Sequence, residues 1–167
     1  INYKKLISFK DIFILYYKNL NMEFLPVELI HTIKEFTVFI PNTREDLQIA
    51  VNLWCDNKDE AYETYGDISC WDISLITDMS GLFAFKKFND NISKWNVSNV
   101  KNMSCMFSDC YKFNQPLNDW DVSKVEDMSN MFYETFYFNQ DLSSWDVSRV
   151  FSMREMFHSC KKFNQPL

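Results

Sequence analysis

The stretch W-D-V-S-K-V-E-D-M-S-N-M-F at residues 120–132 decides the fold, because residues 95–107 read W-N-V-S-N-V-K-N-M-S-C-M-F. The same pattern returns every 24 or 25 residues through the second half of the chain. Its recurring positions are Trp71, Trp95, Trp120 and Trp145, then Met79, Met103, Met128 and Met153, then Phe83, Phe107, Phe132 and Phe157, and lastly Asn89, Asn114, Asn139 and Asn164. A fixed period of this length indicates repeats that stack on one another.

The apolar period changes within one repeat. From Val100 to Cys110 the apolar residues are spaced by three and four, as on one face of a helix. Ser123, followed three residues later by Glu126, forms a capping-box pattern. Residues 113–122 suit a short strand and a turn. The sequence therefore predicts an α/β (α+β) fold, a repeat solenoid of about four 25-residue coils, each a short helix plus a short strand or turn, with an N-terminal helical cap.

The repeated columns are predicted to be structural. The Trp and Met columns would form a core shared between coils, and the Asn side chains would satisfy backbone groups that turns leave unpaired. Asp or Asn at positions 72, 96, 121 and 146 would hold turns in the same way. The alternatives are a ligand on the Asn column, calcium at the acids, and a metal or flexible partner at the Met column.

Composition argues against several classes of function. The formal net charge of −6 does not suit a nucleic-acid surface. No run approaches the roughly 18 apolar residues of a membrane span. Five cysteines without a C-x-x-C pair, and two isolated glycines, suggest no metal and no cofactor. His31 and His158 lie in different segments without a catalytic motif, so we expect no catalytic residues and no enzyme.

Residues 91–117 and 141–167 closely resemble repeats of the BspA-type leucine-rich-repeat-like family, also catalogued as a domain of unknown function in mycoplasma surface lipoproteins. The resemblance covers residues 67–167, and residues 43–66 resemble the segment that commonly opens such arrays. Within that segment, Thr43 can cap a helix that carries Leu47, Val51 and Trp54. The resemblance implies binding to proteins, as a surface adhesin or an interaction module. The lipobox cysteine of the bacterial surface members is missing.

Residues 22–36, M-E-F-L-P-V-E-L-I-H-T-I-K-E-F, suggest a second role. They resemble the opening of an F-box, the helical module that docks onto the Skp1 adaptor of ubiquitin ligases. The adaptor-binding candidates on its apolar face are Leu25, Pro26, Leu29, Ile30 and Ile33. The alternative is a helix that packs on the first coil.

The predicted organisation is an upstream or fragmentary segment at 1–21, an F-box-like helix at 22–40, a cap at 41–66 and the repeats at 67–167, truncated within a repeat. The predicted function is a non-enzymatic protein–protein interaction module. The alternatives are an F-box-type adaptor that recruits targets to Skp1 and a surface adhesin. We expect an intracellular location, host cytoplasm for a viral protein, with the cell surface as the alternative. The partner-binding candidates are Tyr111, Tyr133, Phe136 and Tyr137, which could instead fill gaps under the coils.

Overall fold

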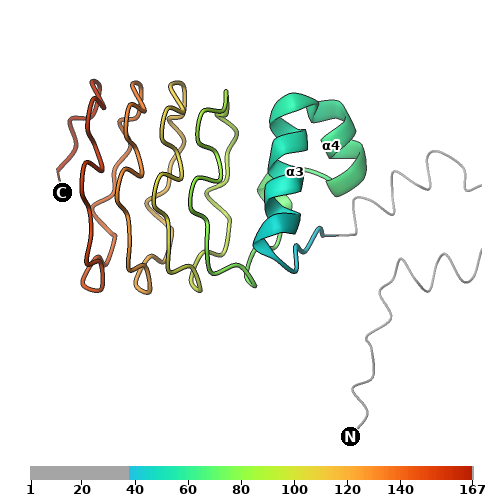
Figure 1. Ribbon diagram of the computed structural model, residues 1–167, viewed down its shortest axis with the longest axis horizontal. Helices are drawn as coiled ribbons and strands as arrows, with labels where there is room; N and C mark the ends of the chain where they lie inside the picture. The colour runs from blue at the N-terminus through green and yellow to red at the C-terminus, as the bar shows by residue number, and fades with distance from the viewer. Residues whose placement is uncertain (1–37, 167) are drawn as a thin grey trace, which may run out of the picture. The chain divides into compact units, whose positions relative to one another are not determined.

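The computed structural model describes residues 38–166, which belong almost entirely to the second of the two units of the chain, Phe39–Leu167. Helices α3 (Arg44–Asp56) and α4 (Lys58–Tyr65) come first, followed by the 3₁₀ helix η1 (Ile68–Cys70). The repeats follow as loops that lie side by side in chain order, with α3 against the first repeat (Figure 1). Within residues 38–166, no helix has the length and apolar character needed to cross a membrane.

Helix α3 begins where the sequence predicts. The Asp46 N–H donates to the Thr43 hydroxyl at 3.1 Å, and the Asp46 carboxylate accepts the Thr43 N–H at 2.9 Å. This reciprocal pair is a capping box, so the first turn of α3 has its free N–H groups satisfied. The buried residues Leu47, Val51 and Trp54 form one face of the helix.

The predicted α/β repeat solenoid is wrong. Residues 71–166 contain no α-helix and no β-strand, and neighbouring repeats meet only in isolated parallel bridges between Asp78, Asn102, Asp127 and Ser152. The helix expected after Ser123 is absent; the Ser123 N–H instead donates to the Asp121 carboxylate at 3.1 Å. The strand expected within residues 113–122 is irregular backbone as well.

Consecutive turns replace the expected helix. In the second repeat, the N–H groups of Met106, Ser108 and Cys110 each donate to the carbonyl three residues earlier, at 2.9–3.2 Å. Cys105 and Asp109 adopt positive φ angles of 55° and 56°, which an α-helix excludes. The turn corners place buried residues three and four apart, so the turns reproduce the apolar spacing of a helix face.

The turns leave alternate N–H groups free to bond the next repeat. The N–H groups of Met79, Gly81, Phe83 and Phe85 donate to the carbonyls of Asn102, Ser104, Met106 and Ser108 at 2.8–2.9 Å. The same four bonds recur between the second and third repeats and between the third and fourth. A helix would use these N–H groups internally, so turns and not helices allow the repeats to bond laterally.

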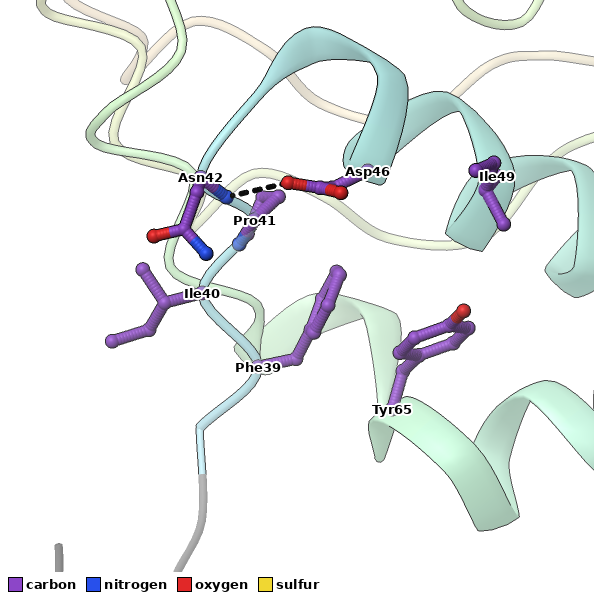
Figure 2. Close-up of a pocket in the computed structure, with 7 residues that line it drawn as sticks. All are labelled: Phe39, Ile40, Pro41, Asn42, Asp46, Ile49 and Tyr65. Carbon is purple, nitrogen blue, oxygen red and sulfur yellow. Dashed lines mark hydrogen bonds between the residues drawn. The ribbon is translucent and has the colours of Figure 1, made fainter.

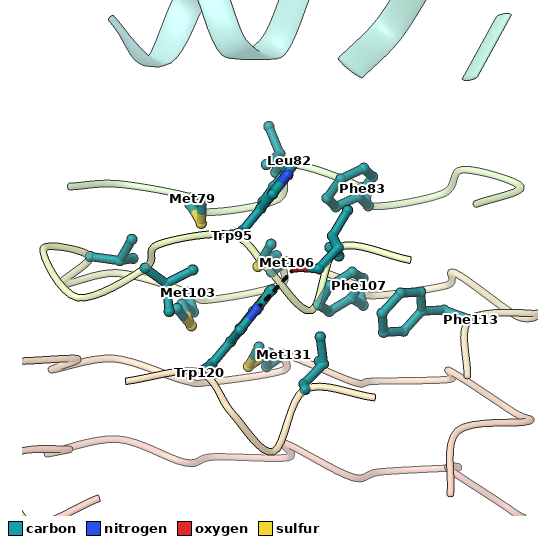
Figure 3. Packing of buried hydrophobic residues seen from close by; sticks show 14 of the residues in the cluster. Met79, Leu82, Phe83, Trp95, Met103, Met106, Phe107, Phe113, Trp120 and Met131 are labelled. Carbon is teal, nitrogen blue, oxygen red and sulfur yellow. Dashed lines mark hydrogen bonds between the residues drawn. The ribbon is translucent and has the colours of Figure 1, made fainter. Parts of the chain in front are cut away.

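Aromatic columns fill the space between the repeats (Figure 3). The Phe107 ring stacks on Phe83 at 5.5 Å and on Phe132 at 5.6 Å between centroids, and it also stacks on Phe113 within its own repeat at 4.0 Å. The Trp120 indole N–H donates to the Ile92 carbonyl at 3.2 Å, so the polar atom of a buried Trp has a partner. Each repeat therefore buries its apolar residues against its neighbours.

Helix α3 covers the first repeat with side-chain donors. The first repeat has no earlier repeat to supply N–H groups. The Arg44 guanidinium donates to the Ser80 carbonyl, and the Gln48 amide donates to the Leu82 carbonyl at 3.1 Å. These carbonyls correspond to those of Ser104 and Met106 in the second repeat, which accept the N–H groups of Gly81 and Phe83 of the first repeat. Arg44 and Gln48 therefore supply the hydrogen-bond donors that backbone N–H groups of a preceding repeat supply elsewhere.

Candidate functional site

The candidate site is a row of aromatic and acidic side chains at the second turn of the second and third repeats. We call it the aromatic edge and define it as Asp109, Tyr111, Tyr133, Glu134, Phe136 and Tyr137. The side chains of Tyr111 and Tyr137 are 54% and 52% exposed, while Tyr133 and Phe136 are half-buried. The remaining Phe and Trp residues of the repeats are largely buried, apart from Phe85 and Phe151.

The turns bring the members of the edge together. Asp109 and Glu134 each lie two residues after a column Phe, and the Asp109 N–H donates to the Tyr133 carbonyl at 2.8 Å. The Tyr137 N–H donates to the Tyr111 carbonyl at 3.2 Å, which joins the outer part of the same turns. The four aromatic candidates predicted from the sequence therefore lie on adjacent repeats along one edge.

Side-chain contacts link neighbouring members. The Tyr111 hydroxyl donates to the Asp109 carboxylate at 3.4 Å, and the Phe136 and Tyr137 rings lie 5.0 Å apart. The Lys161 ammonium lies 5.1 Å from the centre of the Phe136 ring, within cation–π range. His158, which the sequence analysis did not assign to this edge, stacks on Tyr133 at 5.0 Å.

Nearby carboxylates and partial burial both raise the pKa values of Tyr111 and Tyr133. The Asp109 carboxylate, with smaller effects from partial burial and Glu134, raises the pKa of the Tyr111 hydroxyl. Partial burial, followed by Glu134 and Glu155, raises the pKa of the Tyr133 hydroxyl. Both phenols therefore stay neutral at physiological pH in a negative local potential.

Most residues of the predicted structural columns form hydrogen bonds within or between repeats or are buried in the core. The Asn89 side-chain oxygen accepts the Asn114 N–H at 2.9 Å, and Asn114 and Asn139 accept from the next repeat in the same way. Asp or Asn at 72, 96, 121 and 146 each accepts the N–H two residues later. Met79, Met103 and Met128 are fully buried, whereas Met153 is 42% exposed.

A cavity of about 260 Å³ lies at the cap, between residues 39–42 and the two helices (Figure 2). Phe39, Ile49 and Tyr65 contribute apolar walls. The Asp46 carboxylate at its rim already accepts the Asn42 and Thr43 N–H groups.

The buried thiols of Cys110 and Cys160 are poor nucleophiles. Burial raises the pKa of Cys110 to about 12 and that of Cys160 to about 11. Within residues 38–166, no group of three or more His, Cys, Asp or Glu side chains is arranged to hold a metal ion.

The family model described as "Mycoplasma protein of unknown function, DUF285" matches residues 55–167. The chain belongs to this family. The DUF285 match begins near the end of α3 and includes the whole aromatic edge. Among curated proteins and among solved structures, none matches the chain significantly.

The adaptor-binding candidates Leu25, Pro26, Leu29, Ile30 and Ile33 lie outside the described residues and outside the DUF285 match. The sequence analysis did not place Asp109 and Glu134 in the site. Their shared spacing of two residues from the column Phe was the signal that could have found them. Arg44 and Gln48 gave no such signal, because their partners are backbone carbonyls more than 30 residues away.

Proposed function

We propose that this DUF285 chain is a non-enzymatic protein–protein interaction module of the BspA-like leucine-rich-repeat type, and that the aromatic edge is its binding surface. The observation that carries the proposal is that exposed Tyr111 and Tyr137 lie with half-buried Tyr133 and Phe136 on adjacent repeats, which gathers four aromatic side chains along one edge. Exposed tyrosines offer a large contact area at a small cost in side-chain entropy, and they are enriched at protein interfaces.

Within the repeats, the residues that hold adjacent repeats together differ from those of the aromatic edge, and this supports the proposal. Column residues such as Phe107 and Asn114 hold adjacent repeats together. The edge positions vary between repeats, since residues 111, 136 and 161 are Tyr, Phe and Lys. A side chain that is free of the stacking role can be used for recognition without loss of the fold.

Peptide phage display against the full chain tests the proposal. Selected peptides are expected to bind the wild type and to lose at least tenfold in affinity, about 1.4 kcal/mol, for Tyr111→Ala/Phe136→Ala/Tyr137→Ala. The control variant is Leu75→Ala/Phe151→Ala, which removes exposed apolar side chains from another part of the repeats. Failure to select any peptide, or equal binding to both variants, would contradict the proposal.

A second proposal is that the chain is an F-box-type adaptor. The L-P-V-E-L-I-H-T-I segment at residues 25–33 supports it, through its apolar Leu and Ile spacing. Calorimetry of the full chain with Skp1 should show binding that Leu29→Asp abolishes. An absence of heat with a folded protein would remove the adaptor role and leave the repeat module standing.

A further inference from the structure

We propose that the stack of repeats has a second interaction surface at the end opposite α3, and that this surface binds a segment with the family's own repeat pattern, supplied by another polypeptide. We call this surface the end face and define it as Met153, Glu155, Phe157, Ser159, Phe163 and Asn164. All six residues lie in the fourth repeat, residues 145–166, at the far end of the stack from the helices (Figure 1). The end face shares no residue with the aromatic edge, so it adds a second surface to the proposed function.

The end face carries a row of backbone donors. In the third repeat, four alternate N–H groups donate to carbonyls of the fourth repeat at 2.8–2.9 Å, and they belong to Met128, Asn130, Phe132 and Glu134. The equivalent N–H groups of the fourth repeat, those of Met153, Glu155, Phe157 and Ser159, donate to no acceptor within residues 38–166. Glu155 and Ser159 have positive φ angles of 53° and 57°, as the equivalent residues of the third repeat do. The fourth repeat therefore already has the turns that direct these donors outward.

The apolar part of the end face is more exposed than the same positions in the earlier repeats. The Met128 side chain is fully buried, whereas that of Met153 is 42% exposed. Phe157 and Phe163 are half-buried, although the equivalent rings of the third repeat are fully buried because these two rings stack on them at 5.6 and 6.0 Å. A segment that covered the end face as each repeat covers the one before it would remove this apolar surface from water.

Two acceptors complete the match to a repeat. The Asn139 side-chain oxygen accepts the Asn164 N–H at 2.8 Å, and the Asn164 side-chain oxygen is the next in this row but accepts no N–H from residues 38–166. The Leu117 carbonyl accepts the Trp145 indole N–H at 2.9 Å, and the Leu142 carbonyl holds the equivalent place in the fourth repeat. A partner that uses the whole face thus needs alternate carbonyls, a Trp indole and an Asn N–H in register, and the repeat pattern supplies all three.

The polarity of the hydrogen bonds disfavours a second copy of this chain as the partner. Two end faces related by a twofold axis would oppose N–H groups to N–H groups and leave both rows unpaired. Head-to-tail stacking would need the carbonyls of the first repeat, but two of these already accept side-chain donors of α3, from Arg44 and Gln48. Residues 1–37 contain no copy of the Trp, Met and Phe pattern, so the segment comes from another polypeptide.

Fluorescence anisotropy tests the inference with the full chain and a labelled peptide of residues 117–141, which covers the second repeat within the chain. The peptide should bind at least tenfold more tightly than the same peptide carrying Phe132→Asp, which lacks a stacking ring. Met153→Glu in the full chain should weaken binding at least tenfold, because it places a charge on the end face. The matched control is Phe151→Glu, which introduces the same charge at a 76% exposed position that is Glu126 in the third repeat, and it should leave binding unchanged.

Amide hydrogen exchange locates the bound peptide. In the free chain, the N–H groups of Glu155 and Phe157 should exchange faster than those of Asn130 and Phe132, and the peptide should slow their exchange at least tenfold. Equal binding of the two peptides, equal binding by the wild type and Met153→Glu, or unchanged exchange at Glu155 and Phe157 would overturn the inference. The exchange measurement needs no variant of the chain, so it decides the matter even where Met153→Glu fails to fold.

Two controls separate this surface from the alternatives. A dimer in sedimentation velocity that Met153→Glu dissociates, without binding of the peptide, would overturn the inference and assign the end face to a second copy. The variant Tyr111→Ala/Phe136→Ala/Tyr137→Ala should bind the repeat peptide as the wild type does, and a loss of binding there would place the peptide on the aromatic edge instead. The end face can therefore fail while the proposed function stands.

Discussion

Removing the two side-chain donors of α3 should detach the helical cap from the repeats. The change is Arg44→Met with Gln48→Leu, which removes both donors and keeps a high helix propensity at both positions. It leaves the Ser80 and Leu82 carbonyls facing α3 without a donor. The packing face of Leu47, Val51 and Trp54 stays intact, so the change isolates the hydrogen bonds.

The magnitude follows from the cost of unpaired polar groups. A carbonyl left unsatisfied under a packed helix costs about 1–3 kcal/mol, and the charged Arg44 donor belongs at the upper end. The Arg44–Asp78 ion pair at 3.9 Å adds little, because both side chains are more than a third exposed. The double variant should lose about 2–5 kcal/mol of unfolding free energy, a large share of a typical 5–15 kcal/mol.

Urea unfolding followed by tryptophan fluorescence measures this loss, because Trp54 of α3 packs edge-on against Trp71 at 5.7 Å. The matched control is Ile49→Gln on the same helix, where the side chain is 59% exposed and the expected change is within about 0.5 kcal/mol. A loss below about 0.5 kcal/mol in the double variant would refute the idea that side chains replace the backbone ladder.

Three further predictions concern the repeats. Phe107→Ala should cost about 3–5 kcal/mol in urea unfolding, because the ring is fully buried and stacks on both adjacent repeats; a cost below about 1 kcal/mol would contradict the stacked core. Alkylation near pH 8 should modify exposed Cys70 far faster than Cys110, whose pKa is about 12, and equal rates would show that Cys110 is open to solvent. Hydrogen bonds from Ser123 lower the pKa of Asp121. The Asp121 carboxylate therefore stabilises the fold at pH values above its unfolded pKa, and this stabilisation is lost as the pH falls through its folded pKa. Asp121→Asn keeps the acceptor, so its Tm should fall less between neutral pH and about pH 3 than that of the wild type, and an equal fall would show that the bond is not formed.

Sequence reasoning reached the features that depend on local chemistry or on exact repetition. Thr43 and Asp46 form a local pair, so the start of α3 could be read from four residues. The spacing of Phe83, Phe107 and Phe132, 24 and then 25 residues, indicated that these rings meet, and they stack within 5.6 Å. Both inferences need only a short segment or a constant period.

The secondary structure of the repeats could not be derived in this way. Met103, Met106 and Phe107 have the spacing of a helix face and are all buried, yet the backbone between them is a series of turns. Apolar spacing records which residues face the core and does not distinguish a helix from turns that present the same residues. The deciding factor is lateral hydrogen bonding between repeats, which is a tertiary interaction.

The aromatic edge was partly predictable. The columns of Tyr111 and Tyr137 vary between repeats, with Phe136 and Lys161 in the first and Lys112 and Lys162 in the second, and this variation singled them out in the sequence. The contribution of Glu134 depends on its positive φ and on its position beside Asp109, and neither is visible without the backbone.

Site-specific photocrosslinking tests the central claim, that the aromatic edge is the binding surface, most directly. Tyr137 or Phe151 of the full chain is replaced by p-benzoylphenylalanine, and each protein is irradiated with a peptide obtained by phage selection. Both side chains are exposed, at 52% and 76% respectively, but only Tyr137 belongs to the aromatic edge. We predict a covalent adduct at position 137 and none at position 151. An adduct at 151 with none at 137 would contradict the account.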